Sequence, residues 1–407
     1  MSDYGYYGNQ KRRSKRGGMT RGGVEQNDSS SLLPLVLDLV ISVVSIFLVL
    51  IFMLALLARW ISPEKMPMLA VVGLFYPFVY VANLLCMLYW VMRWSRMFWL
   101  LLLVVMLGWG SVKKFYRPEL VKQYQTEQQD DYDEEQHKNG IVVMTYNVVG
   151  FVAQEKEDRE DLIEKIAALA EEKSAGVVCF QEFRNSQSCT SRMEAALSNL
   201  RYSSFVNYDF GDQTAYGGGL AIYSVYPIIN SGVVDMGTQR VHSMWVDLKV
   251  DGDTIRVVSN HLQSTHVTKK DRDETISTKI ISDTTASEKV KSLARKLADN
   301  YSLRAVQADS LRSFIEKTPY PVVVCGDLND TAGSYVYREV ARDLKDTFTE
   351  QGTGFVHTFR DFWNLFRIDY IFVSDEFKVY EYDVPQVKYS DHLPVFSRIQ
   401  LTERRKE

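Results

Sequence analysis

The sequence predicts an α/β or α+β layered domain that follows an N-terminal membrane region. Three observations lead to this prediction. Long and almost uncharged apolar segments lie within the first 112 residues. After residue 140, short β-rich runs alternate with a few segments of helical periodicity. Charge is divided as well: residues 1–129 contain 14 Lys and Arg against 7 Asp and Glu, whereas residues 130–407 contain 33 against 44. Together, the apolar segments and the composition exclude three classes of protein: a wholly soluble chain, a disulfide-stapled chain and a wholly disordered chain.

The first 31 residues predict a disordered basic tail, because they are rich in Gly, Ser and Tyr and lack apolar periodicity. They are followed by Leu32–Leu57, a 26-residue apolar run with a single acid, Asp38. This run is too long for the apolar part of a signal peptide. It is long enough to cross a hydrocarbon core of ~30 Å, which needs about 20 residues. We therefore expect a first transmembrane helix here.

Two further apolar runs, Met68–Met92 and the 16-residue Met97–Val112, predict a membrane region over 32–112 with about three transmembrane helices. Tryptophans lie near the ends of the runs, as interfacial anchors do: they are Trp60, Trp90, Trp94, Trp99 and Trp109. The alternative is three buried helices of a soluble protein. We disfavour it, because long uncharged runs leave no polar face for water.

The topology follows from the basic tail, which precedes the first span and is expected to stay cytoplasmic. Three spans then place the C-terminal half outside the cytoplasm, and the expected location is a bacterial inner membrane. If the short third run does not cross, the orientation inverts. Residues 113–139 predict a polar, acidic linker, and residues 140–407 one compact domain.

Apolar runs bounded by turn residues predict the strands of this domain. The expected strands are Ile141–Tyr146, Gly176–Phe180, Gly219–Ser224, Ser243–Val250, Thr254–Ser259, Pro321–Cys325, Tyr370–Val373 and Val395–Leu401. Helical spacing of apolar residues predicts helices over Glu160–Lys173 and Ser287–Lys317.

Polar residues recur where these strands begin or end. They are Asn147, Gln181, Glu182, Asn260, His261, Asp327, Asn329, Asp330, Asp369, Asp391 and His392. Any one of them alone is more simply a turn residue or a structural histidine. Together they predict a site, because the ends of core strands are rigid and hold side chains in a fixed arrangement. Several acids near one another would repel without a cation, which favours a metal ion.

The motifs TYN, QE, GGLAIYS, NHL, GDLND, IDYIF and SDHLPV occur in an order that resembles the endonuclease/exonuclease/phosphatase superfamily, the deoxyribonuclease I-like proteins. The resemblance covers roughly Ile141 to Leu401. It implies a four-layer α/β sandwich with the site at one edge of two packed sheets. It also implies hydrolysis of a phosphoester, either a phosphodiester or a phosphomonoester, that depends on Mg²⁺ or Mn²⁺.

The resemblance also implies roles for single residues. Asp327 would orient or deprotonate the attacking water, and Asn329 would hold a phosphoryl oxygen. His392 would contact the phosphate with its orientation set by Asp369, and His261 would be a phosphate ligand or general acid. The metal ligands would be Asn147, Glu182 and Asp391, whose hard oxygens suit Mg²⁺.

The partners expected are the lipid bilayer and a phosphoester substrate: a lipid head group, a lipid-linked phosphate or nucleic acid. Tight nucleic-acid binding is not expected, because the acidic domain lacks a basic footprint. Lys269, Lys270 and Arg272 lie in a charged loop that either meets phosphates or is simply solvated. Arg304 and Gln307 face either the site or solvent.

The alternatives to an enzyme are a non-catalytic domain that binds a phosphorylated ligand or partner, and a transporter with a regulatory domain. Asp38 as the lone acid in the spans disfavours the transporter.

Overall fold

The computed structural model describes residues 29–119, 140–152, 159–209, 218–265 and 284–402. The predicted basic tail up to residue 28 and most of the predicted linker, residues 120–139, lie outside these ranges. Lys269, Lys270 and Arg272 lie outside them too.

Apolar helices make up the N-terminal region: α1 (Ser29–Ala58), α2 (Pro67–Leu74), α3 (Tyr76–Met92) and α4 (Met97–Val112). Leu32–Ala58 has a mean hydropathy of 3.2 and is long enough to cross a membrane. The second predicted span is two helices, α2 and α3, bent by 55°. Pro77 lies in the first turn of α3 and has no N–H to continue the helical bonding, so the break falls just before it. By length and composition, the described residues hold one membrane-crossing helix, or two if this bent pair is a single span.

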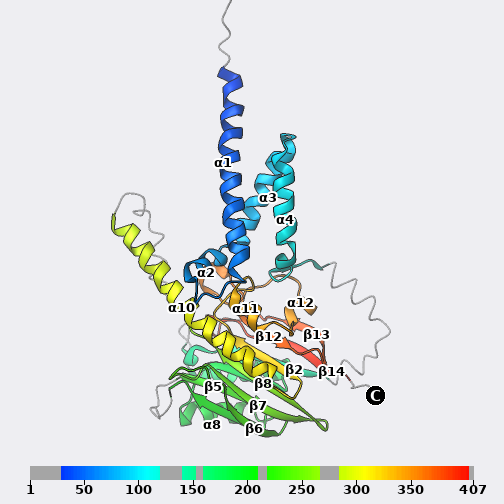
Figure 1. Ribbon diagram of the computed structural model, residues 1–407. Helices are drawn as coiled ribbons and strands as arrows, with labels where there is room; N and C mark the ends of the chain where they lie inside the picture. The colour runs from blue at the N-terminus through cyan, green and yellow to red at the C-terminus, as the bar shows by residue number, and fades with distance from the viewer. Residues whose placement is uncertain (1–28, 120–139, 153–158, 210–217, 266–283, 403–407) are drawn as a thin grey trace, which may run out of the picture. The chain divides into compact units, whose positions relative to one another are not determined.

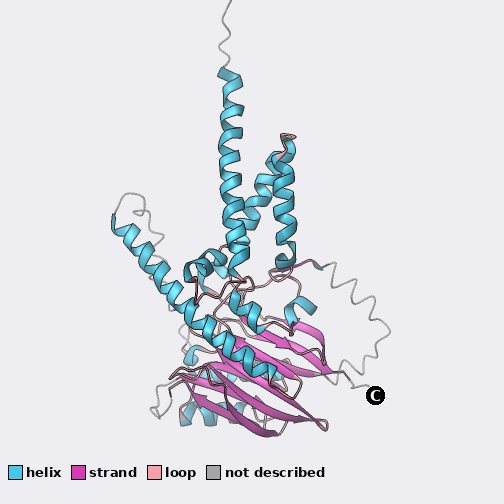
Figure 2. Cartoon of the chain, in the orientation of Figure 1, coloured by secondary structure: helices cyan, strands magenta, loops and turns pink. Residues whose placement is uncertain are grey.

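Two six-stranded sheets form the C-terminal region (Figures 1 and 2). The first sheet has the order β10 (Lys345–Asp346), β12 (Asp369–Val373), β9 (Val322–Asp327), β8 (Asp253–His261), β7 (Ser243–Val250) and β6 (Ile228–Val233). The second has the order β13 (Phe377–Asp383), β14 (Val395–Leu401), β2 (Ile141–Asn147), β3 (Val177–Arg184), β5 (Gly218–Ser224) and β4 (Tyr202–Asn207). The pairs β8–β9 and β2–β3 are parallel, and the other pairs in these sheets are antiparallel.

Successive side chains along a strand point to opposite faces of its sheet. Each sheet therefore packs on the other sheet with one face and on helices with the other, which gives four layers. One face of each sheet meets the other sheet in a shared apolar core that includes Val143, Cys179, Val257 and Cys325. The outer face of the second sheet packs on α7 (Arg159–Glu172) and α8 (Gln187–Ala196). The outer face of the first sheet packs on α10 (Thr284–Glu316) and α11 (Tyr335–Val340). This is the expected four-layer α/β sandwich, and α10 crosses its sheet in Figure 1.

Every strand and helix predicted after residue 140 is present with small shifts at its ends. Strands β4, β6 and β13 were not predicted, because solvent-facing polar residues interrupt their apolar pattern. The remaining elements are short: β1 (Tyr116–Arg117), which pairs with β11 (Gly354–Phe355), the 3-10 turn η1 (Val149–Phe151), α12 (Thr347–Gln351) and α13 (Asp361–Asn364).

Candidate active site

Strand pairing brings most of the predicted site residues to one edge of the sandwich. In the first sheet, His261 ends β8 directly opposite Asp327, which ends the parallel strand β9. Asp369 begins the antiparallel strand β12 and also lies opposite Asp327. In the second sheet, Asn147 ends β2. The two sheets meet here, because the side-chain amide of Asn147 donates a hydrogen bond of 3.2 Å to Oδ2 of Asp327.

Asp327 occupies the centre of the cluster and is only 1% exposed. Its Oδ1 accepts a hydrogen bond of 2.7 Å from the backbone N–H of Asn329, and its Oδ2 accepts one of 3.2 Å from the Asn329 side chain. Burial and the nearby Asp369 raise the pKa of Asp327 to about 7. Such a carboxylate is well placed to accept a proton near neutral pH.

The backbone before Asp327 requires a glycine. Gly326 has a φ of +125°, and an added Cβ would lie 2.1 Å from the carbonyl oxygen of Asn260 on β8. Only a residue without a side chain permits this close approach of β9 to β8. Asn329 also has a positive φ, +52°, which asparagine tolerates better than most residues. The GDLND sequence thus bends tightly enough for Asn329 to bond back to Asp327.

His392 and Asp369 form a buried pair on the other side of Asp327. Nδ1 of His392 lies 2.9 Å from Oδ2 of Asp369, and its Nε2 lies 3.8 Å from Oδ2 of Asp327. Although burial opposes the charged ring, the two carboxylates raise the pKa of His392 to about 10. The imidazolium donates a hydrogen bond to Asp369 through Nδ1 and presents Nε2–H toward the cluster.

His261 is buried as well, but its charge state is the opposite one. Burial, with a smaller contribution from His392, lowers the pKa of His261 to about 3. Its Nε2 lies 3.4 Å from Oε1 of Glu182 and 3.8 Å from Oδ2 of Asp327. The two histidines therefore differ in protonation at neutral pH. His392 is a charged hydrogen-bond donor, and His261 is a neutral ring.

Glu182 projects from an irregularity in β3. The register of β3 against β5 shifts between Phe180 and Phe183, and Glu182 has a φ of +51°. Bulges of this kind are common beside active sites, where they re-aim a side chain. Oε1 of Glu182 accepts a hydrogen bond of 3.1 Å from the Asn147 side chain, yet 35% of the side chain stays exposed. Its carboxylate is therefore both positioned and accessible.

Asp391 is the third predicted metal ligand. Burial raises its pKa, and the Glu182 carboxylate adds to this shift, so the two acids lie near enough to repel each other. Two adjacent carboxylates with an amide oxygen form a hard donor set that fits Mg²⁺ or Mn²⁺. A second buried group that has metal-ligand spacing is Asp327, Asp369 and His392. In this group, Nδ1 of His392 is engaged in the hydrogen bond with Asp369, so that nitrogen is not open to a ligand.

Three residues at strand ends have structural partners instead. The Gln181 side chain donates to Ser259 Oγ at 3.1 Å and so joins the two sheets. Asn260 donates to the Cys325 carbonyl at 3.0 Å and accepts from the Ser243 hydroxyl at 2.7 Å. Asp330 is 3% exposed, and its Oδ1 accepts from the N–H of Thr331 at 2.9 Å.

Neither Arg304 nor Gln307 faces solvent. Gln307 is 2% exposed and accepts a hydrogen bond of 2.8 Å from the backbone N–H of Gln263, next to the end of β8. Arg304 is fully buried, lies over the ring of Tyr301 at 4.3 Å and acts electrostatically on the Asp330 carboxyl. Gln307 therefore supports the segment after β8, and Arg304 offsets the burial of the Asp330 carboxyl.

Several further residues, which were not predicted from the sequence, hold this cluster in place. The Tyr208 hydroxyl accepts a hydrogen bond of 2.7 Å from the Glu182 backbone N–H, and its ring lies 5.3 Å from that of His261. The ring of Phe359 lies 5.0 Å from that of His392. Thr358 Oγ1 accepts from the backbone N–H of Asp369 at 3.0 Å, and Ser390 Oγ donates to the Asn147 carbonyl at 2.8 Å. These residue types have no pattern in sequence that distinguishes them from ordinary loop residues.

A family model described as Endonuclease/Exonuclease/phosphatase family matches residues 144–392, more than half of the chain. The chain belongs to this family. Members of the endonuclease/exonuclease/phosphatase family are generally phosphoesterases and usually depend on a divalent metal. A second model, Domain of unknown function (DUF8431), matches residues 38–115. No curated protein matches the chain significantly.

Solved structures of other proteins are similar to the endonuclease/exonuclease/phosphatase region. A protein of this family from Beutenbergia cavernae is 19% identical, with a TM-score of 0.45, over 65% of this chain and 72% of that one. The human Nocturnin catalytic domain is 18% identical, with a TM-score of 0.46, over 65% and 94%. A mannosyl-6-phosphatase from Bacteroides thetaiotaomicron is 16% identical, with a TM-score of 0.45, over 64% and 100%. These values are too low to bear on the reaction of this chain.

Proposed function

We propose that this protein is a membrane-anchored phosphoesterase that depends on Mg²⁺ or Mn²⁺ and hydrolyses its substrate by in-line attack of an activated water. The observation that carries the proposal is the convergence of Asn147, Glu182, Asp327, Asp369 and His392 at one edge of the two sheets. An anionic phosphoester needs both a positioned base and compensating positive charge, and this cluster supplies groups for each.

Each side chain of the cluster has a separate role in the proposed reaction. Asp327, held by two hydrogen bonds from Asn329, orients or deprotonates the attacking water. His392 directs Nε2–H toward the same space and stabilises charge on a phosphoryl oxygen, with Asp369 fixing its ring. Asn329 contacts a phosphoryl oxygen, and neutral His261 is a further phosphate ligand. The lowered pKa of His261 disfavours the general-acid role that the resemblance also offered, because the ring is not an imidazolium at neutral pH.

The metal ligands we propose are Glu182, Asn147 and Asp391. Carboxylate and amide oxygens suit a hard divalent cation that keeps part of its water shell. The Glu182 side chain is 35% exposed, whereas Asn147 is fully buried, so Glu182 is the accessible ligand of the three. The ion supplies charge neutralisation to the phosphoryl group when it is bound.

Membrane anchoring is supported by Leu32–Ala58 and by the surface of the apolar region. Most of the large exposed apolar side chains in the described residues lie between Leu32 and Trp109, where water is a poor solvent for them. We propose a bacterial inner membrane with the catalytic domain extracytoplasmic, on the basis of the basic N-terminal tail. This orientation requires that the shorter apolar helix α4 crosses in addition to α1 and the bent pair α2–α3.

A membrane-bound enzyme with an acidic catalytic domain favours a substrate at the membrane. We propose a phospholipid head group or a lipid-linked phosphate, with scavenged nucleic acid as the third class. Residues 130–407 contain 33 Lys and Arg against 44 Asp and Glu, which disfavours tight binding of nucleic acid.

The test uses the full chain in an uncharged detergent, with and without Mg²⁺ or Mn²⁺. The substrates are bis-p-nitrophenyl phosphate, plasmid DNA, RNA, sphingomyelin and phosphoinositides. Asp327→Ala and His392→Ala are compared with Asp375→Ala, a matched control whose side chain is 86% exposed. Metal-dependent turnover that is lost in the first two variants and kept in the control is the expected result. A folded, metal-binding protein that hydrolyses none of these substrates would favour the non-catalytic, ligand-binding alternative.

A further inference from the structure

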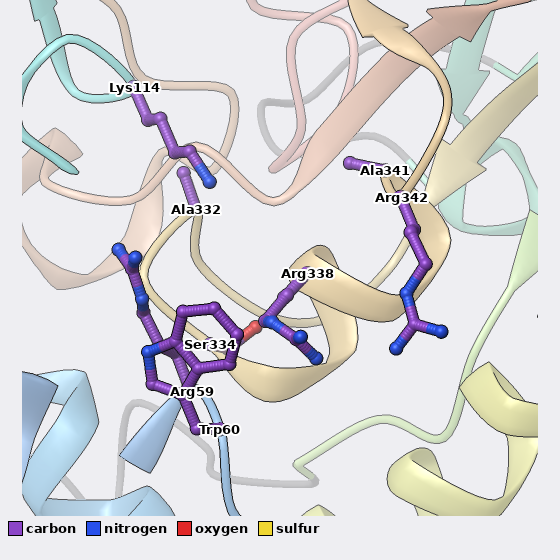
Figure 3. Close-up of a pocket in the computed structure, with 8 residues that line it drawn as sticks. All are labelled: Arg59, Trp60, Lys114, Ala332, Ser334, Arg338, Ala341 and Arg342. Carbon is purple, nitrogen blue, oxygen red and sulfur yellow. The ribbon is translucent and has the colours of Figure 1, made fainter. Parts of the chain in front are cut away.

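A cavity lies where the apolar helices meet the catalytic domain. Its volume is about 260 Å³. Arg59 and Trp60, which follow α1, and Lys114, which follows α4, line it from the helical side (Figure 3). The other lining residues come from the loop before α11, from α11 itself and from the turn after it: Ala332, Ser334, Arg338, Ala341 and Arg342. None of the catalytic or metal-binding candidates is among them.

The lining of this cavity is strongly basic. Arg59, Lys114, Arg338 and Arg342 are four cations among the eight described lining residues, and no acid is among the eight. Acids lie beside the lining residues. Glu339 pairs with Arg338 and with Arg342, the latter at 2.7 Å. Asp346 acts electrostatically on Lys114, and Asp309 interacts with Arg342. Arg59 donates from Nη1 to Ser111 Oγ, while its Nε is buried without a hydrogen-bond partner among the described residues.

Stacking on aromatic rings also holds three of the basic side chains. The guanidinium of Arg338 lies 4.0 Å from the ring centre of Trp60, and that of Arg59 lies 5.2 Å from it. The Lys114 ammonium lies 4.6 Å from the ring centre of Tyr337. The backbone of Lys114 is fixed as well, because its carbonyl accepts a hydrogen bond of 2.9 Å from Arg367. The cations are therefore arranged before any ligand arrives.

Like charges at this density disfavour one another. Burial lowers the pKa of Lys114 to about 8, and Arg59 contributes to the shift. A bound anion would relieve the repulsion and satisfy the buried Nε of Arg59. Phosphate oxygens match this need, since guanidinium groups bind them through paired, charge-assisted hydrogen bonds.

We propose that this cavity binds a phosphate group, and that the head group of an anionic phospholipid supplies it. The cavity lies directly after the ends of two apolar helices, α1 and α4, beside Trp60. Aromatic and basic residues at such helix ends occupy the head-group layer of a membrane. The binding of phosphate is independent of the proposed hydrolysis; only its source in a lipid rests on the proposed membrane anchoring.

The experiment measures ligand binding to the full chain in an uncharged detergent by calorimetric titration. The probes are dihexanoyl phosphatidylglycerol, dihexanoyl phosphatidylcholine and inorganic phosphate. The test variant is Lys114→Gln with Arg338→Gln. The control pair is Lys249→Gln with Lys317→Gln, which removes the same charge from exposed positions. We expect phosphatidylglycerol to bind more tightly than phosphatidylcholine, and the test variant to lose about tenfold or more in affinity, as expected for lost charge-assisted contacts.

Melting temperature in lipid-free detergent reports whether the test variant folds. If it does not, Arg342→Gln is the milder substitution, because its side chain is 45% exposed at the rim. Binding of inorganic phosphate without preference for the lipid would keep the phosphate site and assign it to a free anion. Equal affinity of phosphatidylglycerol for the parent and the folded test variant, or no binding of either anion, would overturn the proposal. If the parent chain binds phosphatidylglycerol but hydrolyses none of the substrates, the result would count against the proposed function and not against the phosphate site.

Discussion

Nδ1 of His392 lies 2.9 Å from Oδ2 of Asp369, and both side chains are almost completely buried. The two residues are 23 positions apart in sequence and come from different sheets of the sandwich: Asp369 begins β12, and His392 precedes β14. The pair orients the opposite ring nitrogen of His392 toward Asp327 at 3.8 Å. The edge where the sheets meet therefore fixes the direction of a charged hydrogen-bond donor.

Replacing Asp369 with Asn should lower kcat for bis-p-nitrophenyl phosphate by about a hundredfold or more, with a smaller change in KM. The amide would no longer hold the ring of His392 with Nε2 protonated, and positioned acid–base groups contribute at about this level. Steady-state kinetics at saturating metal measure the effect. The exposed Asp375→Asn is the matched control, and a kcat for Asp369→Asn within about threefold of the parent would contradict the assigned role.

Replacing Glu182 with Gln should raise the concentration of Mg²⁺ or Mn²⁺ required for half-maximal hydrolysis by about tenfold or more. The substitution keeps the shape of the side chain but removes the charge on the most accessible of the proposed ligands. Titration of Mn²⁺ into the protein without substrate measures binding separately from turnover. An unchanged Mn²⁺ affinity, together with reduced hydrolysis, would assign Glu182 a role other than ligation.

Replacing Gln181 with Ala should destabilise the protein without changing the metal requirement. Gln181 is fully buried and bonds to Thr145 and Ser259, so its removal leaves polar partners unsatisfied at a cost of about 1–3 kcal/mol. For a domain of this size, each kcal/mol lowers the melting temperature by about 2–4 °C. Gln386→Ala, at an exposed position, should leave the melting temperature unchanged. The interpretation of Gln181 as a structural link fails if both variants melt alike.

Binding of phosphatidylglycerol at the basic cavity should weaken as the pH rises from about 7 to about 10. The pKa of Lys114 is lowered to about 8 by burial and by Arg59, Arg367 and Arg338, against the opposing effect of Asp346. Lys114 is therefore charged below this pH and loses its charge above it, while the phosphodiester keeps its charge throughout. A bound anion raises the pKa, so the loss should fall in the upper part of the range.

The matched variant for this prediction is Lys114→Arg, which stays protonated across the whole range. Its affinity for phosphatidylglycerol should change little between the two ends of the titration. A decline of equal size in Lys114→Arg and the parent would show that another group is responsible. Calorimetric titration in the same detergent at each pH provides the measurement.

The strands and the order of the motifs were predictable because both depend on local information. Apolar runs such as Ser243–Val250 and the turn-rich GDLND sequence specify their own backbone. The local pattern could not separate Gln181 from Glu182, which are adjacent and both polar. The bulge in β3 decides between them: it directs Glu182 to the site and leaves Gln181 between the sheets.

By itself, the sequence determined that an apolar region precedes an α/β domain whose strand ends carry acids, amides and histidines. Only the tertiary structure decided which of these side chains meet and what charge they carry, since pKa values depend on burial and on neighbours from distant segments. It also decided that Arg59, Lys114 and Arg338 line one cavity. Long-range packing brings these three residues together, so their proximity could not be predicted from any local pattern in the sequence.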